Sequence, residues 1–331
     1  MEFNAVYYEP NIFHYQLGKE LKKFYQHLPW IQIENHNRIE EMTSQPNSAF
    51  PRMKKNLIIG IRKTHRYTEN HKTSDFLVPY TSSGCSAMCL YCYLVCNYNK
   101  CAYLRLFVNR EQMLEKIIRK AESFSTPLVF EIGSNSDLIL ENTITRNLEW
   151  TISQFRDSKN GFLTFPTKFD MVQPLLPLDH QGKILVRMSV NPDSIIRKIE
   201  LGTSSLDRRI KAANDMCEAG YPTGILIAPI ILLEDWKQSY EQLITQLSDQ
   251  LSEKLKRQLK LEIIFMTYSN IHRFINREAF PNALDLFDQD LMRGRGRGKY
   301  TYRDQVRTEA EIFLREQIGQ KLPDAEIVYI C

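Results

Sequence analysis

The sequence predicts an α/β fold in which parallel βα units close as a barrel or as most of one. Apolar stretches of strand length recur between residues 75 and 268, and amphipathic helical segments lie between them. Strands that alternate with helices are typical of a parallel sheet covered by its helices. The six expected strands are residues 75–80, 128–133, 162–168, 184–190, 223–230 and 261–268.

Three parts are expected along the chain. Residues 1–73 are mixed and polar and form an N-terminal elaboration, in which the proline-containing stretch 44–51 is expected to be a loop. Residues 74–270 hold the partial barrel. Residues 271–331 form a C-terminal segment with a basic β-ribbon followed by a helix that includes residues 307–317.

The helices between the strands show an apolar period near 3.6 residues, as residues 111–124 illustrate. The helix before the fifth strand has both of its ends marked. Ser204 and Asp207 fit a capping box at its start, and Gly220 is placed to end it.

The composition is that of an ordinary globular protein, with 331 residues, 43% of them hydrophobic and 25% charged. The net charge of +4 says little by itself about nucleic acid. The sequence shows no charged-then-apolar leader and no apolar run near eighteen residues, so we expect a cytoplasmic protein with no membrane partner. Thiols stay reduced in that compartment, which argues against a disulfide knot.

Five of the seven cysteines lie within seventeen residues, and Cys85, Cys89 and Cys92 have the spacing C-x3-C-x2-C. Clustered thiols of this kind usually bind metal or act catalytically. Structural zinc needs a closed tetrahedral set of ligands. Cys96 or Cys101 could complete such a set within one loop, but the chain has no second C-x2-C pair. Zinc is therefore the weaker alternative.

An iron–sulfur cluster fits the three thiols better, because thiolates are its usual ligands. Three cysteines would hold three irons of a 4Fe–4S cubane and leave the fourth iron open for chemistry. The spacing C-x3-C-x2-C followed by the aromatic Tyr93 resembles that of the radical S-adenosylmethionine superfamily. This resemblance implies that S-adenosylmethionine binds the open iron and is cleaved to methionine and a 5′-deoxyadenosyl radical.

Polar residues follow several of the expected strands. Ser136 and Asp137 come after the second strand, Lys168 ends the third, Ser189 is near the end of the fourth, and Ala228 is near the end of the fifth. Barrel enzymes place their chemistry where strands end. A cation, hydroxyls and the cysteine loop on one face suit a zwitterionic, ribose-bearing ligand. The alternative is that each is an ordinary polar loop residue.

Residues 292–303 carry five cations and no acid. If this segment is extended, its period of two places Arg293, Arg295, Arg297, Lys299 and Arg303 on one side. The other side then carries three glycines followed by Tyr300 and Tyr302. Cations, bare glycine backbone and an aromatic ring suit a phosphodiester chain with a stacked base. The alternative is a solvated basic loop.

Together these stretches resemble the spore photoproduct lyase family over nearly the whole chain. The matching segments occur in the same order along the chain and include uncommon short sequence motifs. Together they are therefore more specific than the cysteine spacing alone. They lie at residues 8–10, 59–64, 84–93, 130–131, 136–137, 167–169, 189–191, 202–205, 219–221, 228–230 and 298–300.

The resemblance implies a partial (β/α)6 TIM-type barrel and a DNA-repair lyase of the spore core. Its substrate would be DNA containing spore photoproduct, the methylene-bridged thymine dimer. A donor such as flavodoxin or ferredoxin would supply the electron. The implied ligands of the 4Fe–4S cluster are Cys85, Cys89 and Cys92, and the implied contacts of S-adenosylmethionine are Ser136, Asp137, Lys168, Ser189 and the backbone of Ala228.

The resemblance also implies a reaction. The radical would remove hydrogen from carbon 6 of the saturated thymine, and the methylene bridge would then fragment. The resulting thymine radical must regain a hydrogen atom, and Tyr91 and Tyr93 match the relay tyrosines that return the radical to S-adenosylmethionine. The lesion must leave the base stack, and the basic ribbon would hold the opened duplex.

One position departs from the family. The family usually has a hydrogen-donating cysteine where this chain has Ser134. A hydroxyl is a poor hydrogen-atom donor because its O–H bond is stronger than the C–H bond to be formed. We predict that Cys96 substitutes, with Cys101 as the second choice, whereas Cys217 lies on the apolar face of a helix and is expected in the core.

Two alternatives remain open at this point. One is a radical S-adenosylmethionine enzyme with a different substrate, probably a nucleic acid. The other is a non-enzymatic, metal-bearing DNA-binding protein. A brown colour under anaerobic conditions and release of 5′-deoxyadenosine would separate an enzyme from a colourless zinc protein.

Overall fold

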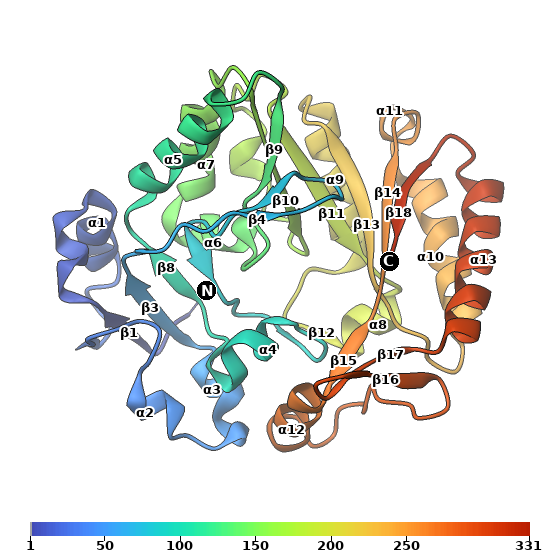
Figure 1. Ribbon diagram of the computed structural model, residues 1–331, viewed down its shortest axis with the longest axis horizontal. Helices are drawn as coiled ribbons and strands as arrows, with labels where there is room; N and C mark the ends of the chain where they lie inside the picture. Colours follow the sequence, from blue (N-terminus) through green and yellow to red (C-terminus); the bar gives the residue numbers. More distant parts are fainter. Residues whose placement is uncertain (1) are drawn as a thin grey trace.

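The computed structural model describes residues 2–331, and its centre is a curved eight-stranded sheet that forms a half-barrel (Figure 1). The strand order is β18-β14-β13-β11-β10-β9-β5-β4, and only the pair β5 and β4 (Thr68–Glu69) is antiparallel. This confirms the predicted α/β partial barrel. The parallel strands are β5 (Phe76–Leu77), β9 (Leu128–Glu131), β10 (Gly161–Thr167), β11 (Ile184–Val190), β13 (Thr223–Ile230), β14 (Lys260–Phe265) and β18 (Glu326–Ile330).

Two strands differ from expectation. The predicted sixth strand, residues 261–268, divides at Met266: β14 stays in the barrel, whereas β15 (Thr267–Ser269) joins a separate sheet. The edge strand β18 was not predicted. Its apolar residues are half-buried or, at Val328, exposed, and its partner β14 is more than sixty positions earlier in the chain, so the local pattern is weak.

Helices cover the outer face of the half-barrel (Figure 1), and the buried side chains of the barrel form one continuous core. Within residues 2–331 no helix is long and apolar enough to cross a membrane. The covering helices are α5 (Arg110–Glu122), α6 (Leu138–Thr145), α7 (Asn147–Phe155), α8 (Asp193–Lys198), α9 (Leu206–Glu218), α10 (Trp236–Gln250), α11 (Glu253–Lys256) and α13 (Asp304–Lys321).

Helix α9 ends as predicted and begins differently. Gly220 has φ +91°, and the amides of Gly220 and Tyr221 donate to the carbonyls of Cys217 and Met216, which is a Schellman motif. The predicted capping box is wrong. The residue before the helix is Ser205, whose side chain makes no capping bond, and Ser204 Oγ instead donates to Asp170 Oδ1.

The N-terminal elaboration contains a five-stranded sheet in the order β2-β1-β3-β8-β6. Strands β8 and β6 come from residues after 73, so this sheet continues into the second expected part; the division by residue number stays a prediction. The elements of this region are β1 (Ala5–Tyr8), α1 (Gln16–Phe24), β2 (Trp30–Gln32), α2 (Glu40–Thr43), α3 (Phe50–Met53), β3 (Asn56–Gly60), β6 (Ser82–Ser83), α4 (Leu94–Tyr98) and β8 (Arg105–Phe107).

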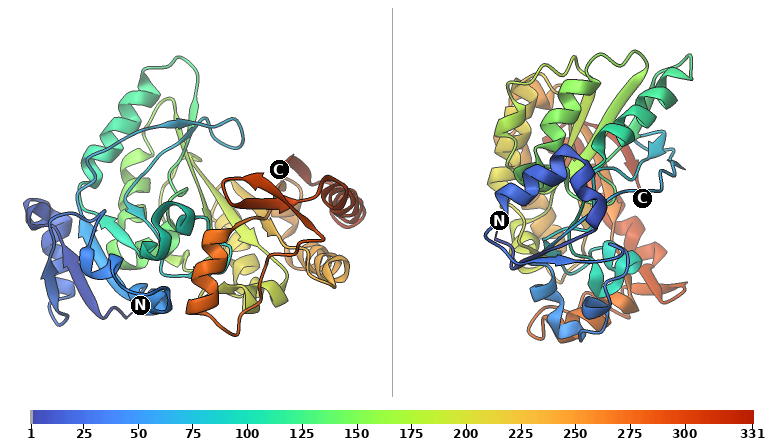
Figure 2. Two further views of the ribbon diagram at one scale, coloured as in Figure 1. Left: turned by 60° about the horizontal axis from the view of Figure 1, so that its bottom comes forward. Right: turned by 90° about the vertical axis from the view of Figure 1, so that its left-hand side faces the viewer.

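The predicted basic ribbon is a β-hairpin of β16 (Met292–Gly296) and β17 (Lys299–Tyr302), which pairs with β15. It lies beside α12 (Asn270–Ala279), as Figure 2 shows. The sequence predicts that the cations lie on one side of a straight strand. The structure does not have this arrangement. Arg297 and Gly298 form the turn, with φ +52° and +67°, and Arg295 lies in a bulge.

Candidate active site

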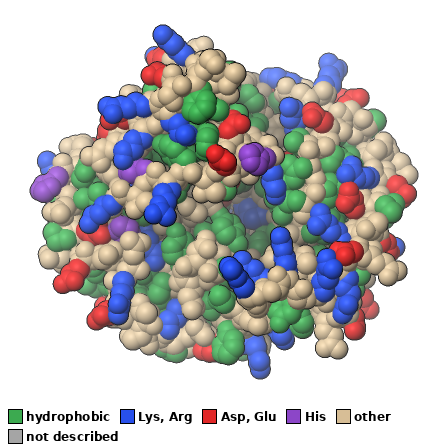
Figure 3. Space-filling model, in the orientation of Figure 1, with side chains coloured by type: hydrophobic (Ala, Val, Ile, Leu, Met, Phe, Trp, Pro, Cys, Tyr) green, Lys and Arg blue, Asp and Glu red, His purple; other side chains and the backbone are tan. Residues whose placement is uncertain are grey.

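A cavity of about 640 Å³ lies at the carboxyl ends of the barrel strands and appears as the hollow in the centre of Figure 3. Parallel strands end there, so residues distant in sequence meet around it. Ten of the residues predicted from the sequence line it: Cys85, Cys89, Tyr91, Cys92, Tyr93, Ser136, Asp137, Lys168, Ser189 and Ala228.

The cysteine loop is held from several sides. The ammonium of Lys54, only 2% exposed, donates to the carbonyls of Cys85 and Ala87 at 2.7 and 2.9 Å. His272 Nε2 lies 3.1 Å from the Cys92 carbonyl. In addition, β7 (Met88–Cys89) pairs with β12 (Glu200–Leu201). These contacts hold the three thiols on one wall of the cavity.

The donor set fits a polynuclear cluster. Burial raises the pKa of Cys85 to about 12, and the nearby charge of Lys54 acts against this rise. Among residues 2–331, no three His, Cys, Asp or Glu side chains are arranged to hold a single metal ion. In a 4Fe–4S cluster each thiolate binds its own iron, so Cys85, Cys89 and Cys92 need only share the cavity wall.

A charged triad, which we call the mouth triad, consists of Lys168, Glu200 and Arg209. Lys168 Nζ lies 3.0 Å from Glu200 Oε1, and Arg209 Nη2 lies 2.7 Å from Glu200 Oε2. Burial opposes ionisation of Glu200, but Lys168 and Arg209 prevail and lower its pKa to about 2. Glu200 and Arg209 were not predicted from the sequence, although they flank the stretch 202–205 that resembles the family.

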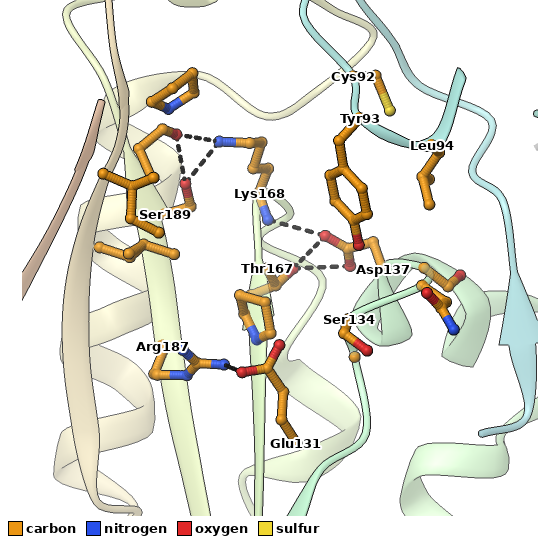
Figure 4. Close-up of a pocket in the computed structure, with 18 of the residues that line it drawn as sticks. Cys92, Tyr93, Leu94, Glu131, Ser134, Asp137, Thr167, Lys168, Arg187 and Ser189 are labelled. Carbon is orange, nitrogen blue, oxygen red and sulfur yellow. Dashed lines mark hydrogen bonds and ion pairs between the residues drawn. The ribbon is translucent and has the colours of Figure 1, made fainter. Parts of the chain in front are cut away.

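Lys168 has no free donor. Its ammonium also donates to Ser189 Oγ at 2.6 Å, as Figure 4 shows, and to the Ala228 carbonyl at 2.7 Å. With Glu200 these partners use all three of its N–H groups. Lys168 therefore acts on a ligand in the cavity by its charge.

Asp137 and Ser136 differ in their remaining capacity to form hydrogen bonds with a ligand. Asp137 caps α6 and accepts hydrogen bonds from the Thr167 hydroxyl and from the backbone amides of Lys168 and Ile139. Its carboxylate therefore positions the loop. Ser136 Oγ is shielded from solvent and has no hydrogen-bond partner within the described chain. A buried hydroxyl without a partner is unfavourable, which indicates that a bound polar group completes it.

The two predicted relay tyrosines are placed differently. Tyr91 donates a hydrogen bond to Glu200 of the mouth triad, and burial together with that carboxylate raises its pKa well above the usual value. The Tyr93 side chain is 54% exposed and points into the cavity toward Asp137 and Ser134 (Figure 4). Tyr93 is therefore the phenol that is open to a ligand.

Cys96 and Cys101 are not among the residues that line the cavity. Cys96 lies on α4 with its sulfur 3.5 Å from Ser269 Oγ. Cys101 packs against the core of the N-terminal sheet. Their assignment as hydrogen donors stays a prediction. Cys217 is 1% exposed on α9, so its expected place in the core is confirmed.

The hairpin lies at the rim of the same cavity. Lys and Arg side chains gather below the hollow in Figure 3, over the β16–β17 hairpin. Arg295, Arg297 and Lys299 are exposed, whereas Arg293 pairs with Asp304 at 2.7 Å. Tyr300 is half-buried, with its ring 4.5 Å from that of Phe287, which limits its surface for stacking.

Fold and site together define a partial-barrel protein with a three-cysteine loop at the carboxyl ends of its strands. The chain belongs to the spore photoproduct lyase family, because a family model with the description "Spore photoproduct lyase" matches residues 1–331. It is 31% identical to spore photoproduct lyase of Bacillus subtilis (strain 168), over 98% of this chain and 97% of that protein.

Solved structures agree with this assignment. A spore photoproduct lyase complexed with dinucleoside spore photoproduct is 29% identical, with a TM-score of 0.91 and 99% of each chain covered. A variant of such a lyase with bound AdoMet and dinucleoside spore photoproduct also has a TM-score of 0.91, with 29% identity and 99% of each chain covered.

Proposed function

We propose that this chain is a radical S-adenosylmethionine lyase that reverts spore photoproduct in DNA to two thymines. The observation that carries this proposal is the placement of Cys85, Cys89 and Cys92 in the cavity lined by Lys168 and Ser189. Related lyases of the same fold have been crystallised with AdoMet and with the dinucleoside lesion, which supports the same ligands here.

The three cysteines would hold a 4Fe–4S cluster. With S-adenosylmethionine, the cluster would supply a carbon-centred radical able to remove hydrogen from thymine carbon 6, and a donor of the flavodoxin or ferredoxin type would supply the electron. The excess positive charge of the mouth triad favours the carboxylate of S-adenosylmethionine. The free hydroxyl of Ser136 is available for a polar group of the same ligand.

The remaining predicted residues have distinct roles in this proposal. The exposed phenol of Tyr93 carries a transferable hydrogen atom at the cavity. Tyr91, which is hydrogen-bonded to Glu200, is the second tyrosine of the relay and exchanges hydrogen with Tyr93. The unpaired cations of the hairpin contact DNA phosphates beside the cavity, where the lesion enters after leaving the base stack.

Anaerobic reconstitution with iron and sulfide, followed by an assay with dinucleoside spore photoproduct and S-adenosylmethionine, tests the proposal. We expect a brown protein that converts the dinucleoside to two separate thymidines, and a Cys92→Ala variant that does not. Release of 5′-deoxyadenosine without lesion reversal would favour a radical enzyme with another nucleic-acid substrate. A colourless zinc protein that leaves S-adenosylmethionine intact would favour the non-enzymatic DNA-binding alternative.

A further inference from the structure

The cavity lacks the thiol that the family usually places in it. Ser134 lines the cavity at that position, and Cys85, Cys89 and Cys92 are assigned to the cluster. Cys217 is buried on α9, where the Gln258 amide lies 3.3 Å from its sulfur. Cys96, Cys101 and Cys331 are not themselves lining residues. Of these three, Cys96 faces Ser269 and Cys101 packs on the N-terminal sheet, whereas Cys331, which was not predicted from the sequence, has lining residues as its neighbours.

Cys331 follows β18 at the edge of the half-barrel. Its amide donates to the Ile263 carbonyl at 3.0 Å, and its carbonyl accepts from the Phe265 amide at 2.7 Å. It therefore lies alongside Ile264, which lines the cavity. Tyr329, two residues earlier, also lines the cavity, and side chains two apart on a strand point to the same face.

A contact across the opening brings the Cys331 sulfur against a residue that lines the cavity, although Cys331 is not a lining residue itself. Lys72 Nζ lies 2.9 Å from Cys331 Sγ, and both Lys72 and the next residue, Thr73, line the cavity. Lys72 belongs to the connection between β4 and β5, at the opposite edge of the sheet from β18. Figure 1 shows these two segments approaching each other across the front of the barrel.

Lys72 leaves the thiol hydrogen unused. An ammonium group only donates, so sulfur accepts in this contact and its own S–H takes no part in it. An independent observation marks the cavity as a ligand site: the shielded Ser136 hydroxyl on its wall has no partner within the described residues.

We propose that Cys331 is the catalytic thiol that gives a hydrogen atom to the thymine radical, in place of the cysteine that Ser134 replaces. This inference rests on the proposed function. The S–H bond of Cys331 breaks, a C–H bond forms on the thymine methylene carbon, and the unpaired electron moves to sulfur. The sulfur radical then takes hydrogen from the phenol of Tyr93. That phenol regains hydrogen through Tyr91 from the 5′-deoxyadenosine that received it from the lesion. The 5′-deoxyadenosyl radical left behind would recombine with methionine, which would re-form S-adenosylmethionine and return one electron to the cluster, so atoms and electrons balance over one turnover.

Substitution in the reconstituted enzyme tests this role. We expect Cys331→Ala to lower the fraction of lesion converted cleanly to two thymines by at least tenfold, with thymine-radical adducts in their place. Adding Ser134→Cys to that variant is expected to restore clean conversion, because it returns a thiol to the cavity wall. Cys217→Ala is the matched control and should convert cleanly. Unchanged conversion by Cys331→Ala, or loss of clean conversion by Cys96→Ala, would overturn the assignment.

A second measurement needs neither cluster nor turnover. Metal-free protein is titrated with dinucleoside spore photoproduct by calorimetry, and its thiols are then labelled with iodoacetamide and mapped by mass spectrometry. The bound dinucleoside should slow labelling of Cys331 at least fivefold and leave Cys101 unchanged. Equal labelling of Cys331 despite measured binding overturns the thiol assignment alone. Absence of dinucleoside binding overturns the proposed function and the assignment with it.

Discussion

Two buried charged triads lie one above the other in the barrel, and their net charges have opposite signs. In the mouth triad one carboxylate, Glu200, lies between two cations. In the second, which we call the floor triad, Arg187 lies between Glu131 at 2.5 Å and Glu262 at 3.0 Å. Figure 4 shows the Arg187–Glu131 pair below Lys168 and Ser189.

The difference places opposite net charges at two levels of one cavity, because Arg187 and Glu131 line it as well as Lys168. The floor triad has an excess of negative charge, and Glu131 and Glu262 raise the pKa of Arg187 although its burial acts the other way. The mouth triad has an excess of positive charge, directed at the cavity and tied to the cysteine loop through Tyr91. An anionic ligand group is therefore favoured at the mouth and disfavoured at the floor.

The largest expected effect is that of Glu200→Gln. It leaves two buried cations without a counter-charge, and breaking a buried ion pair in this way costs about 3–5 kcal/mol. Urea unfolding followed by circular dichroism measures this loss. A loss below about 1 kcal/mol, the range of an exposed pair, would show that the mouth triad is not a structural unit.

Lowering the pH should remove the contribution that the Glu200 carboxylate makes to the free energy of unfolding. The folded-state pKa of Glu200, about 2, lies below its usual value of 4.5. The stability it confers is therefore complete above about pH 4.5 and is lost as the pH falls toward 2, with a total of about 3 kcal/mol. The difference in unfolding free energy between wild type and Glu200→Gln should shrink over this range; a constant difference would contradict the depressed pKa.

Glu262→Gln should have a smaller effect than Glu200→Gln, because Arg187 keeps Glu131 as its counter-charge. We expect a loss of about 1–3 kcal/mol, typical of one buried charged hydrogen bond. The same urea unfolding measures it. If this variant is the less stable of the two, the proposed contrast between floor and mouth is wrong.

The smallest expected effect concerns the cofactor. Lys168→Met removes the excess positive charge of the mouth triad. We expect this variant to bind S-adenosylmethionine about tenfold more weakly, which corresponds to a loss of about 1.4 kcal/mol in binding free energy. Equilibrium dialysis of S-adenosylmethionine with the reconstituted, unreduced protein measures this change. Lys237→Met, on the exposed face of α10, is the control and should bind normally. Equal affinities would show that the charge of Lys168 does not act on the ligand.

Local sequence patterns predicted the features that depend on residues close together in the chain. The apolar runs placed the barrel strands, because burial on both faces of a parallel sheet makes each strand apolar along its length. The strand-end residues Ser136 and Lys168 came together at one cavity, as parallel topology requires. The ribbon prediction failed in detail because Gly298 permits a tight turn that a straight period of two ignores.

By itself the sequence determined the half-barrel, the cysteine loop and the group of residues at the strand ends. Only the tertiary structure decided that Glu200 and Arg209 complete the mouth triad, that Cys96 is turned toward Ser269, and that Cys331 reaches Lys72. The physical reason is that these contacts join segments that are not neighbours in the chain, and in the case of Cys331 opposite edges of the sheet. No local periodicity or spacing specifies which of several similar side chains will meet.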